Sequence, residues 1–170
     1  MPEEVDNRKL SLSSAGTVQL QRYEGLHKSY YNDPAGHCTY GVGTLVHMGP
    51  CTAEELHTPV SDQMIALSLQ AALADTQRLI KKRVTKTQLT QEQFDALTSF
   101  VYNRGGPRSE RVLKLIDHGD FKTARAQMNR VIYGTVSDPK TGKPVKKALP
   151  GLILRRRAET RPFANSGTPK

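Results

Sequence analysis

The stretch that decides the fold is RYEGLHKSYYNDPAGHCTYGVG, from Arg22 to Gly43. It opens with an acidic residue beside a glycine, Glu24-Gly25, and holds the turn sequence Asn-Asp-Pro-Ala-Gly before a Gly-x-Gly. Glycine commonly ends helices, whereas Asp, Pro and Gly together mark turns. The stretch therefore predicts a helix end, a tight turn and a short strand in succession.

The residues before this stretch predict an amphipathic helix. The positions that share one helical face by their spacing are Leu12, Gly16, Leu20 and Tyr23. Ser13 is the expected N-cap and Gly25 the expected terminator, which places Glu24 in the last helical turn.

Between residues 27 and 46 the pattern changes to two short segments that are rich in Tyr, Val and Thr. Pro34, Ala35 and Gly36 separate them, so they predict a β-hairpin. In the second segment Thr39, Gly41 and Gly43 would point to one face. We expect the alternate glycines to leave that face flat, open to a ligand or another backbone.

The remainder predicts a helical bundle. An amphipathic pattern covers residues 61–84, and a Thr-x-x-Gln capping box at Thr90 and Gln93 starts a helix that stops at Gly105. Further helices are expected over residues 110–118, 121–131 and 152–161. The Gly-, Pro- and Lys-rich segment 134–150 predicts a long exposed loop. Helices far outweigh strands, so the expected fold class is α+β, a small β-hairpin sheet plus a mostly helical bundle.

The expected organisation is one domain over residues 10–163, with residues 24–60 as a small β-rich lobe. Residues 1–9 and 164–170 are polar and predict flexible tails. No apolar run is long enough to span a membrane, and the first residues hold no apolar signal segment. We therefore expect synthesis in the cytoplasm without a signal peptide and no stable membrane insertion.

The net charge of +9 indicates a polyanionic partner. Nucleic acid is not expected, because the lysines and arginines are scattered and do not alternate with aromatic residues. Cys38 and Cys51 are too few for a disulfide framework, and two free thiols are the favoured interpretation. A bridge between them in an oxidising compartment is the alternative.

We expect no metal site and no cofactor. Glu24-x-x-His27 resembles half of a di-metal carboxylate motif, but the chain holds no second copy of it. The histidines at positions 27, 37, 47 and 57 recur every ten residues, which fits neither the helical nor the strand period.

Glu24 and Asp33 form a candidate acid–base pair. A carboxyl at a helix C-terminus meets the negative end of the macrodipole, which favours its protonated form. A carboxyl at a hairpin tip meets solvent and backbone N–H groups, which favour its ionised form. Two carboxyls with opposed environments are typical of glycoside hydrolysis.

The spacing of Glu24, Asp33 and Thr39, followed by Gly-x-Gly, resembles the signature of phage-type lysozymes, glycoside hydrolase family 24. LSSAGTVQLQRYEG is similar to that family's opening helix, LTQEQFDALTSFVYNRG to its central core helix, and PGLILRRRAETRPF to its closing helix. The resemblance covers about residues 10–163 and implies an active-site cleft between the two lobes.

The resemblance implies a role for each of the three residues. Glu24 would protonate the glycosidic oxygen between N-acetylmuramic acid and N-acetylglucosamine. Asp33, with Thr39, would hold the attacking water on the opposite face of the sugar. This is the inverting arrangement, in which the carboxyls lie ~6.5–9.5 Å apart.

Further positions match parts of the family pattern. Tyr102 and Asn103 match a sugar-contacting position, and Leu45 is a further contact candidate. Thr44 stands where some members carry a histidine, which predicts altered packing rather than lost catalysis. One arginine among residues 155–157 is expected to pair with the catalytic glutamate, and the other two are expected to form a solvated basic face.

The expected function is therefore a monomeric, cofactor-free muramidase that cuts peptidoglycan and lyses bacteria. The absence of a wall-binding module in the sequence suggests a thin, Gram-negative-type wall. Release to the periplasm would depend on a phage holin, or on a secretion system, in which case an immunity protein would be a partner. The alternatives are a lytic transglycosylase that uses Glu24 alone, and a basic binding protein on an inactive scaffold.

Overall fold

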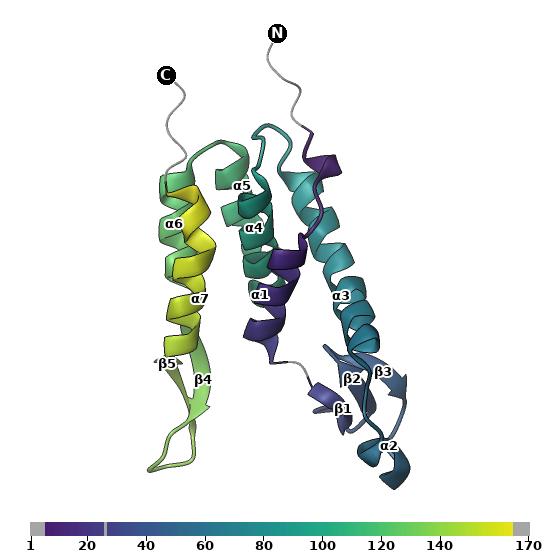
Figure 1. Ribbon diagram of the computed structural model, residues 1–170. Helices are drawn as coiled ribbons and strands as arrows, with labels where there is room; N and C mark the ends of the chain where they lie inside the picture. Colours follow the sequence, from purple (N-terminus) through teal and green to yellow (C-terminus); the bar gives the residue numbers. More distant parts are fainter. Residues whose placement is uncertain (1–5, 26, 165–170) are drawn as a thin grey trace. The chain divides into compact units, whose positions relative to one another are not determined.

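The structure is a computed structural model that describes residues 6–25 and 27–164 (Figure 1). The chain divides into two units. The central unit comprises residues 17–76, and the terminal unit comprises residues up to 16 together with those from 77 onward. The central unit includes the expected small lobe over residues 24–60 and extends beyond it.

The central unit is built around a three-stranded antiparallel sheet in the order β1-β2-β3. Its strands are β1 (His27–Asn32), β2 (Cys38–Gly41) and β3 (Thr44–His47). The short helix α2 (Ala53–His57) follows β3. Helix α1 (Ser14–Glu24) leads into this unit at its N-terminal end, and helix α3 (Asp62–Arg83) leads out of it at its C-terminal end.

Helix α1 is formed as its capping residues predict. The Ser13 hydroxyl accepts a hydrogen bond from the Gly16 N–H at 3.0 Å, which is the N-cap contact. At the other end Gly25 adopts a φ of +57°, and its N–H donates to the Gln21 carbonyl at 3.2 Å. This left-handed residue ends the helix directly after Glu24.

The second segment of the expected hairpin is two strands, not one. Gly41 and Gly43 have φ values of +61° and +98°, so the chain turns between them and starts β3 at Thr44. The flat face predicted from these glycines is therefore wrong. A Cβ at Gly41 would lie 2.7 Å from the Ser68 Oγ of α3, whereas a Cβ at Gly43 would meet no atom within 4 Å.

Thr44 and Ser68 hold this turn against α3. Their hydroxyls share a hydrogen bond, and the Val42 N–H also donates to the Ser68 Oγ at 3.4 Å. Ser68 is buried. Thr44 thus contributes a packing contact between this turn and α3.

We predict that Gly41→Ala destabilises the protein by about 2–4 kcal/mol, because a left-handed φ and a clash with a fixed serine add together. Gly43→Ala shares the strained φ but meets open space, so it should cost about 1–2 kcal/mol. Urea unfolding followed by circular dichroism measures both. Equal losses for the two variants would contradict the close contact with Ser68.

The terminal unit is mainly helical. It holds η1 (Asn7–Lys9), α4 (Gln91–Arg104), α5 (Gly106–Asp117), α6 (Phe121–Asn129), β4 (Tyr133–Ser137), β5 (Pro144–Ala148), α7 (Pro150–Thr160) and η2 (Arg161–Phe163). Its buried core gathers around the fully buried side chains Phe94, Leu97, Phe100, Leu113, Ile116 and Met128.

Helix α4 starts and stops as predicted. The Thr90 hydroxyl accepts the Gln93 N–H, and the Gln93 side chain accepts the Thr90 N–H, which completes the capping box. Gly105 ends the helix with a φ of +91°. The next helix begins at Gly106 rather than at the expected Glu110, because Pro107 is compatible with a first helical turn.

The expected long loop over residues 134–150 is largely a β-hairpin. Strands β4 and β5 pair in register from Tyr133 opposite Ala148 to Ser137 opposite Pro144. Asp138 Oδ1 accepts the N–H groups of Lys140 and Thr141 at 2.7 and 3.0 Å and closes the turn. The Gly-, Pro- and Lys-rich composition indicated the turn, but it did not indicate the short strands on both sides of the turn.

The expected N-terminal tail over residues 1–9 is wrong at its last residues, because Asn7 is only 3% exposed. The Asn7 side-chain amide donates to the Val84 and Thr87 carbonyls at 2.9 and 2.8 Å, and its oxygen accepts the Leu89 N–H at 2.9 Å. These bonds fasten η1 to the loop after α3. The expected tail over residues 164–170 lies, apart from Ala164, outside the described residues.

Candidate active site

Glu24 is the last residue of α1 and its side chain is partly exposed. It belongs to the central unit, as do Asp33, Thr39 and Leu45. Gly25 has a left-handed φ and ends the helix, so Glu24 is the last helical residue before the chain continues to β1. A carboxyl thus stands at a helix end, as the sequence predicted.

Asp33 lies in the turn directly after β1, and the backbone of that turn surrounds it. Its Oδ1 accepts the His37 N–H at 2.9 Å, and its own N–H donates to the His37 carbonyl at 3.0 Å. The hydrogen bond from the His37 N–H lowers the pKa of Asp33 below the usual carboxyl value, and bonds from Ala35 and Thr39 act in the same direction. Asp33 is therefore held in its ionised form, as expected.

Thr39 lies on β2 and is only 2% exposed. Its hydroxyl lies 3.4 Å from Asp33 Oδ2 and 3.0 Å from the His37 carbonyl, so its hydrogen is directed at these two acceptors. The structure thus brings Asp33 and Thr39 together, as the spacing in the sequence suggested. Leu45 is the cross-strand partner of Thr39 on β3 and is 53% exposed.

Two residues near Asp33 were not predicted. His37 organises the turn through its backbone, and its Nδ1 accepts the Gly49 N–H at 3.0 Å. Burial raises the pKa of Tyr31, and the negative charge of Asp33 raises it further. The Asp-Pro-Ala-Gly turn could have indicated His37, because an Asp side chain often accepts a backbone N–H further along its own turn.

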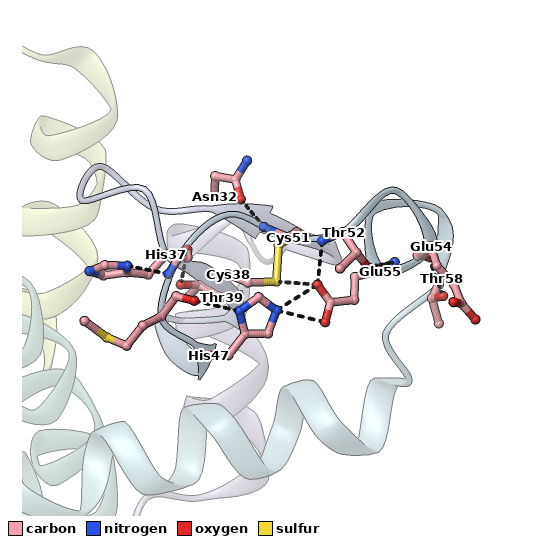
Figure 2. A network of polar contacts seen from close by, with 12 residues as sticks. Asn32, His37, Cys38, Thr39, His47, Cys51, Thr52, Glu54, Glu55 and Thr58 are labelled. Atoms are coloured by element: carbon pink, nitrogen blue, oxygen red, sulfur yellow. Dashed lines mark hydrogen bonds and ion pairs between the residues drawn. A yellow bond between two sulfur atoms is a disulfide. The ribbon is translucent and has the colours of Figure 1, made fainter.

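A disulfide joins Cys38 and Cys51, so the favoured interpretation of two free thiols is wrong. Figure 2 shows the bridge between Cys38 on β2 and Cys51, which lies two residues before the start of α2. The Cys51 N–H also donates to Asn32 Oδ1 at 2.7 Å. Asn32 directly precedes Asp33, and Cys38 directly precedes Thr39. Cys51 therefore contacts the neighbour of each residue of the Asp33–Thr39 pair, one through a hydrogen bond and the other through the disulfide.

His47 and Glu55 form an ion pair beside the disulfide. The His47 Nε2 lies 2.9 Å from both carboxylate oxygens of Glu55 (Figure 2). The bond to the Met48 carbonyl, with help from Glu55, raises the pKa of His47, whereas His47 and the Thr52 N–H lower the pKa of Glu55. Both groups are thus stabilised in their charged forms.

Tyr102 and Asn103 lie in the last turn of α4, within the terminal unit. Asn103 is exposed, and its side-chain oxygen accepts a hydrogen bond from the Arg156 guanidinium. Whether either residue contacts sugar stays a prediction.

The expectation that two of the three arginines form a solvated basic face is wrong, because Arg155 and Arg156 are buried and only Arg157 is exposed. Arg155 Nε lies 2.9 Å from Glu159 Oε1, and Arg156 Nη1 lies 2.5 Å from Glu159 Oε2. These two arginines have a carboxylate partner within their own helix. Pairing of one arginine with Glu24 stays a prediction.

The family of the chain follows from comparison with known proteins. The sequence profile of the phage lysozyme family matches residues 21–159. The chain belongs to the phage lysozyme family. The match includes Glu24, Asp33 and Thr39, and it confirms the family that the sequence resemblance indicated.

Individual relatives agree with this assignment. An endolysin of Acyrthosiphon pisum secondary endosymbiont phage 1 is 29% identical over 159 residues, which are 92% of this chain and 100% of that protein. An endolysin of Bacillus phage PZA is 31% identical over 167 residues, 95% of this chain, but the match spans only 57% of that longer protein.

Solved structures confirm the α+β lysozyme fold. The muramidase domain of SpmX from Asticaccaulis excentricus matches with a TM-score of 0.71 at 26% identity, over 95% of this chain and 100% of that one. As a phage lysozyme family member, the chain is a muramidase glycosidase whose reaction is peptidoglycan hydrolysis. In the part that the structure describes, no helix combines the length and hydropathy that a membrane crossing requires.

The Thr39 hydroxyl gives a prediction for this lysozyme's pH profile. Thr39→Val removes a hydrogen bond to the Asp33 carboxylate, which should lower kcat about tenfold, the value of one such bond. Because the bond lowers the pKa of Asp33, its loss should also move the acid limb of kcat/KM to higher pH. Thr39→Ser keeps the hydroxyl and serves as the control. An unchanged acid limb in Thr39→Val would contradict the contact.

Proposed function

We propose that this lysozyme hydrolyses the β-1,4 bond between N-acetylmuramic acid and N-acetylglucosamine. In this proposal Glu24 is the general acid that protonates the leaving oxygen. Asp33 is the base that, together with Thr39, orients a water molecule for attack at the opposite face of the sugar. The products would be two hydrolysed glycan ends, one of them a reducing N-acetylmuramic acid.

The observation that carries the proposal is the environment of Asp33. Its carboxylate accepts the His37 N–H at 2.9 Å, faces the Thr39 hydroxyl at 3.4 Å and has a lowered pKa. An ionised carboxylate beside a hydroxyl can fix a water molecule through two oriented hydrogen bonds. The His37 N–H binds Oδ1 of Asp33, and the Thr39 hydroxyl faces Oδ2.

We assign the acid role to Glu24 because it occupies the other carboxyl position of the family pattern and lies on α1, a different element from the turn that holds Asp33. It stands at the end of α1, a regular element that positions a side chain more firmly than a loop does. Division of acid and base roles between two carboxyls in different environments is the general pattern of glycoside hydrolysis.

Sugar contacts are proposed for Leu45, Tyr102 and Asn103. Leu45 offers an apolar surface on β3, opposite Thr39 in the sheet register. Asn103 keeps its amide N–H groups available for a sugar hydroxyl while its oxygen accepts from Arg156. The basic charge of the chain suits a substrate that carries peptide carboxylates.

The proposed site of action is the bacterial periplasm after synthesis in the cytoplasm, with release through a holin or a secretion system. The disulfide is compatible with action in an oxidising compartment. If a secretion system delivers the protein, a dedicated immunity protein would be its partner. No stable oligomer is required, since all three proposed catalytic residues lie in one chain.

Product analysis tests the proposed reaction. Purified protein is incubated with peptidoglycan, and the released muropeptides are identified by mass spectrometry before and after borohydride reduction. Reducing-end N-acetylmuramic acid, which gains two hydrogens on reduction, is the expected product. A 1,6-anhydro product would instead indicate a lytic transglycosylase, and the absence of any product would indicate a wall-binding protein on an inactive scaffold.

A further inference from the structure

Four side chains with metal-binding atoms gather where β2, β3 and the start of α2 meet (Figure 2). They are Cys38, His47, Cys51 and Glu55. The ligand atoms of Cys38, His47 and Glu55 all lie within 4.8 Å of one another, and the disulfide adds the Cys51 sulfur to the same place. Both cysteines are buried, whereas His47 and Glu55 are partly exposed.

The distances of Glu55 from Cys38 and from His47 are close to those of a zinc site. Zinc binds thiolate sulfur at about 2.3 Å and imidazole nitrogen or carboxylate oxygen at about 2.0–2.2 Å, so ligand atoms on a tetrahedron lie about 3.3–3.8 Å apart. Cys38 Sγ lies 3.5 Å from Glu55 Oε2, and His47 Nε2 lies 2.9 Å from the same carboxylate. The histidine and the carboxylate need to separate only slightly, and the two sulfurs need only to part from each other.

The groups behind these ligands are already oriented as in built metal sites. The His47 Nδ1 donates to the Met48 carbonyl at 3.0 Å, which directs the Nε2 toward the cluster. Glu55 Oε2 accepts the Thr52 N–H at 2.7 Å, which fixes the carboxylate at the helix start. Hydrogen bonds of this kind orient the ligands of natural zinc sites.

We propose that the reduced form of this protein binds one zinc ion through Cys38, Cys51, His47 and Glu55, and that the disulfide form does not. Two thiolates, an imidazole and a carboxylate form a four-ligand set of the kind that zinc prefers. In the disulfide form the sulfurs carry no negative charge and cannot serve as thiolate ligands.

The exchange between the two forms balances as a thiol–disulfide reaction. A small-molecule thiol reduces the Cys38–Cys51 bond with two electrons and two protons and is itself converted to a disulfide. Zinc binding then releases the two thiol protons and the proton that lies between His47 and Glu55. In the reverse direction, an oxidising disulfide removes two electrons from the thiolates, the protein disulfide forms and the zinc ion leaves.

In this proposal the cluster links the same segments of the chain in both an oxidising and a reducing compartment. The disulfide connects β2 to the segment that leads into α2, next to the Asp33–Thr39 pair. In a reducing compartment zinc would make the same connection, because all four ligands come from these neighbouring segments. The spacing of His47 in the sequence did not indicate this site, since its partners lie on different elements.

Zinc titration tests the proposal. The full-length protein is reduced with a phosphine, freed of metal under anaerobic conditions and titrated with zinc against a chromophoric chelator. We expect one zinc ion per reduced chain, and at least about 100-fold weaker binding after His47→Ala or Glu55→Gln, because each removes a ligand. The matched controls are His57→Ala and Glu54→Gln, both on α2, which should leave the affinity unchanged.

Cobalt in place of zinc provides a second readout, because a thiolate-to-cobalt charge-transfer band reports sulfur ligands directly. That band should appear only in the reduced protein and should disappear on oxidation. If the reduced chain is unfolded without metal, zinc should restore its circular dichroism spectrum. The proposal is overturned if the reduced chain binds no zinc whether folded or not, if the disulfide form binds equally well, or if the two ligand variants bind as tightly as their controls.

Discussion

Glu24→Gln should lower the rate of peptidoglycan hydrolysis by about 10²–10⁴-fold, the usual contribution of a general acid. The amide has nearly the same shape as the carboxyl group but cannot deliver a proton to the leaving oxygen. Because Glu24 is a partly exposed residue at the end of α1, the variant should fold normally. Turbidity loss of a peptidoglycan suspension measures the rate, and circular dichroism measures the fold.

Glu54→Gln is the matched control for this variant. It makes the same change of charge on an exposed residue of the same unit, on α2. We expect it to retain wild-type activity. Hydrolysis by Glu24→Gln at a rate close to that of the control would exclude Glu24 as the proton donor.

Glu159→Ala should destabilise the protein by about 3–5 kcal/mol, the cost of leaving buried charges without a partner. The Glu159 carboxylate lies between Arg155 and Arg156, and the side chains of Arg156 and Glu159 are 1% and 2% exposed. Burial lowers the pKa of Arg156, and the charge of Glu159 opposes that shift. The Glu159 carboxylate also accepts a hydrogen bond from the Ser99 hydroxyl at 2.6 Å. Glu159→Ala would therefore also remove this acceptor of the Ser99 hydroxyl.

Urea unfolding measures this loss, with Glu110→Ala as the control. Glu110 also pairs with an arginine, at 2.9 Å from Arg83 Nε, but the two side chains are 45% and 43% exposed. Exposed pairs of this kind contribute about 0–1 kcal/mol. A loss at Glu159 no larger than that at Glu110 would contradict the structural importance of the buried cluster.

The buried arginine cluster illustrates what the sequence could not predict. Arg155, Arg156 and Arg157 are adjacent and identical, and only packing decides which of them are buried. Glu159 lies at helical spacing from two of them, so the ion pairs were available to sequence reasoning. Their burial against α4 depends on distant segments, as the contact between Arg156 and the Phe100 ring shows.

Local signals predicted the helices well. The Ser13 and Thr90 caps and the glycines at positions 25 and 105 set helix ends through contacts within a few residues, and such contacts are encoded locally. The strands were less predictable. The turn between β2 and β3 depends on the contact of Gly41 with Ser68, which lies on another element.

The candidate site was predictable in part for the same reason. Asp33, His37 and Thr39 lie within one turn and the following strand, so their spacing in the sequence predicts their proximity. The sequence indicated the disulfide only as an alternative to two free thiols, because the pairing depends on how the chain returns from β3 to α2. The pairing of His47 with Glu55 depends on the same return of the chain.

The anomeric form of the first product tests the central claim most directly. A soluble peptidoglycan oligosaccharide is hydrolysed in an NMR tube, and the new N-acetylmuramic acid end is observed before it mutarotates. If Asp33 directs water to the face opposite the leaving group, the β-linked substrate must give the α-anomer first. A first product in the β form, which would make Asp33 a nucleophile, or a 1,6-anhydro product would contradict the account.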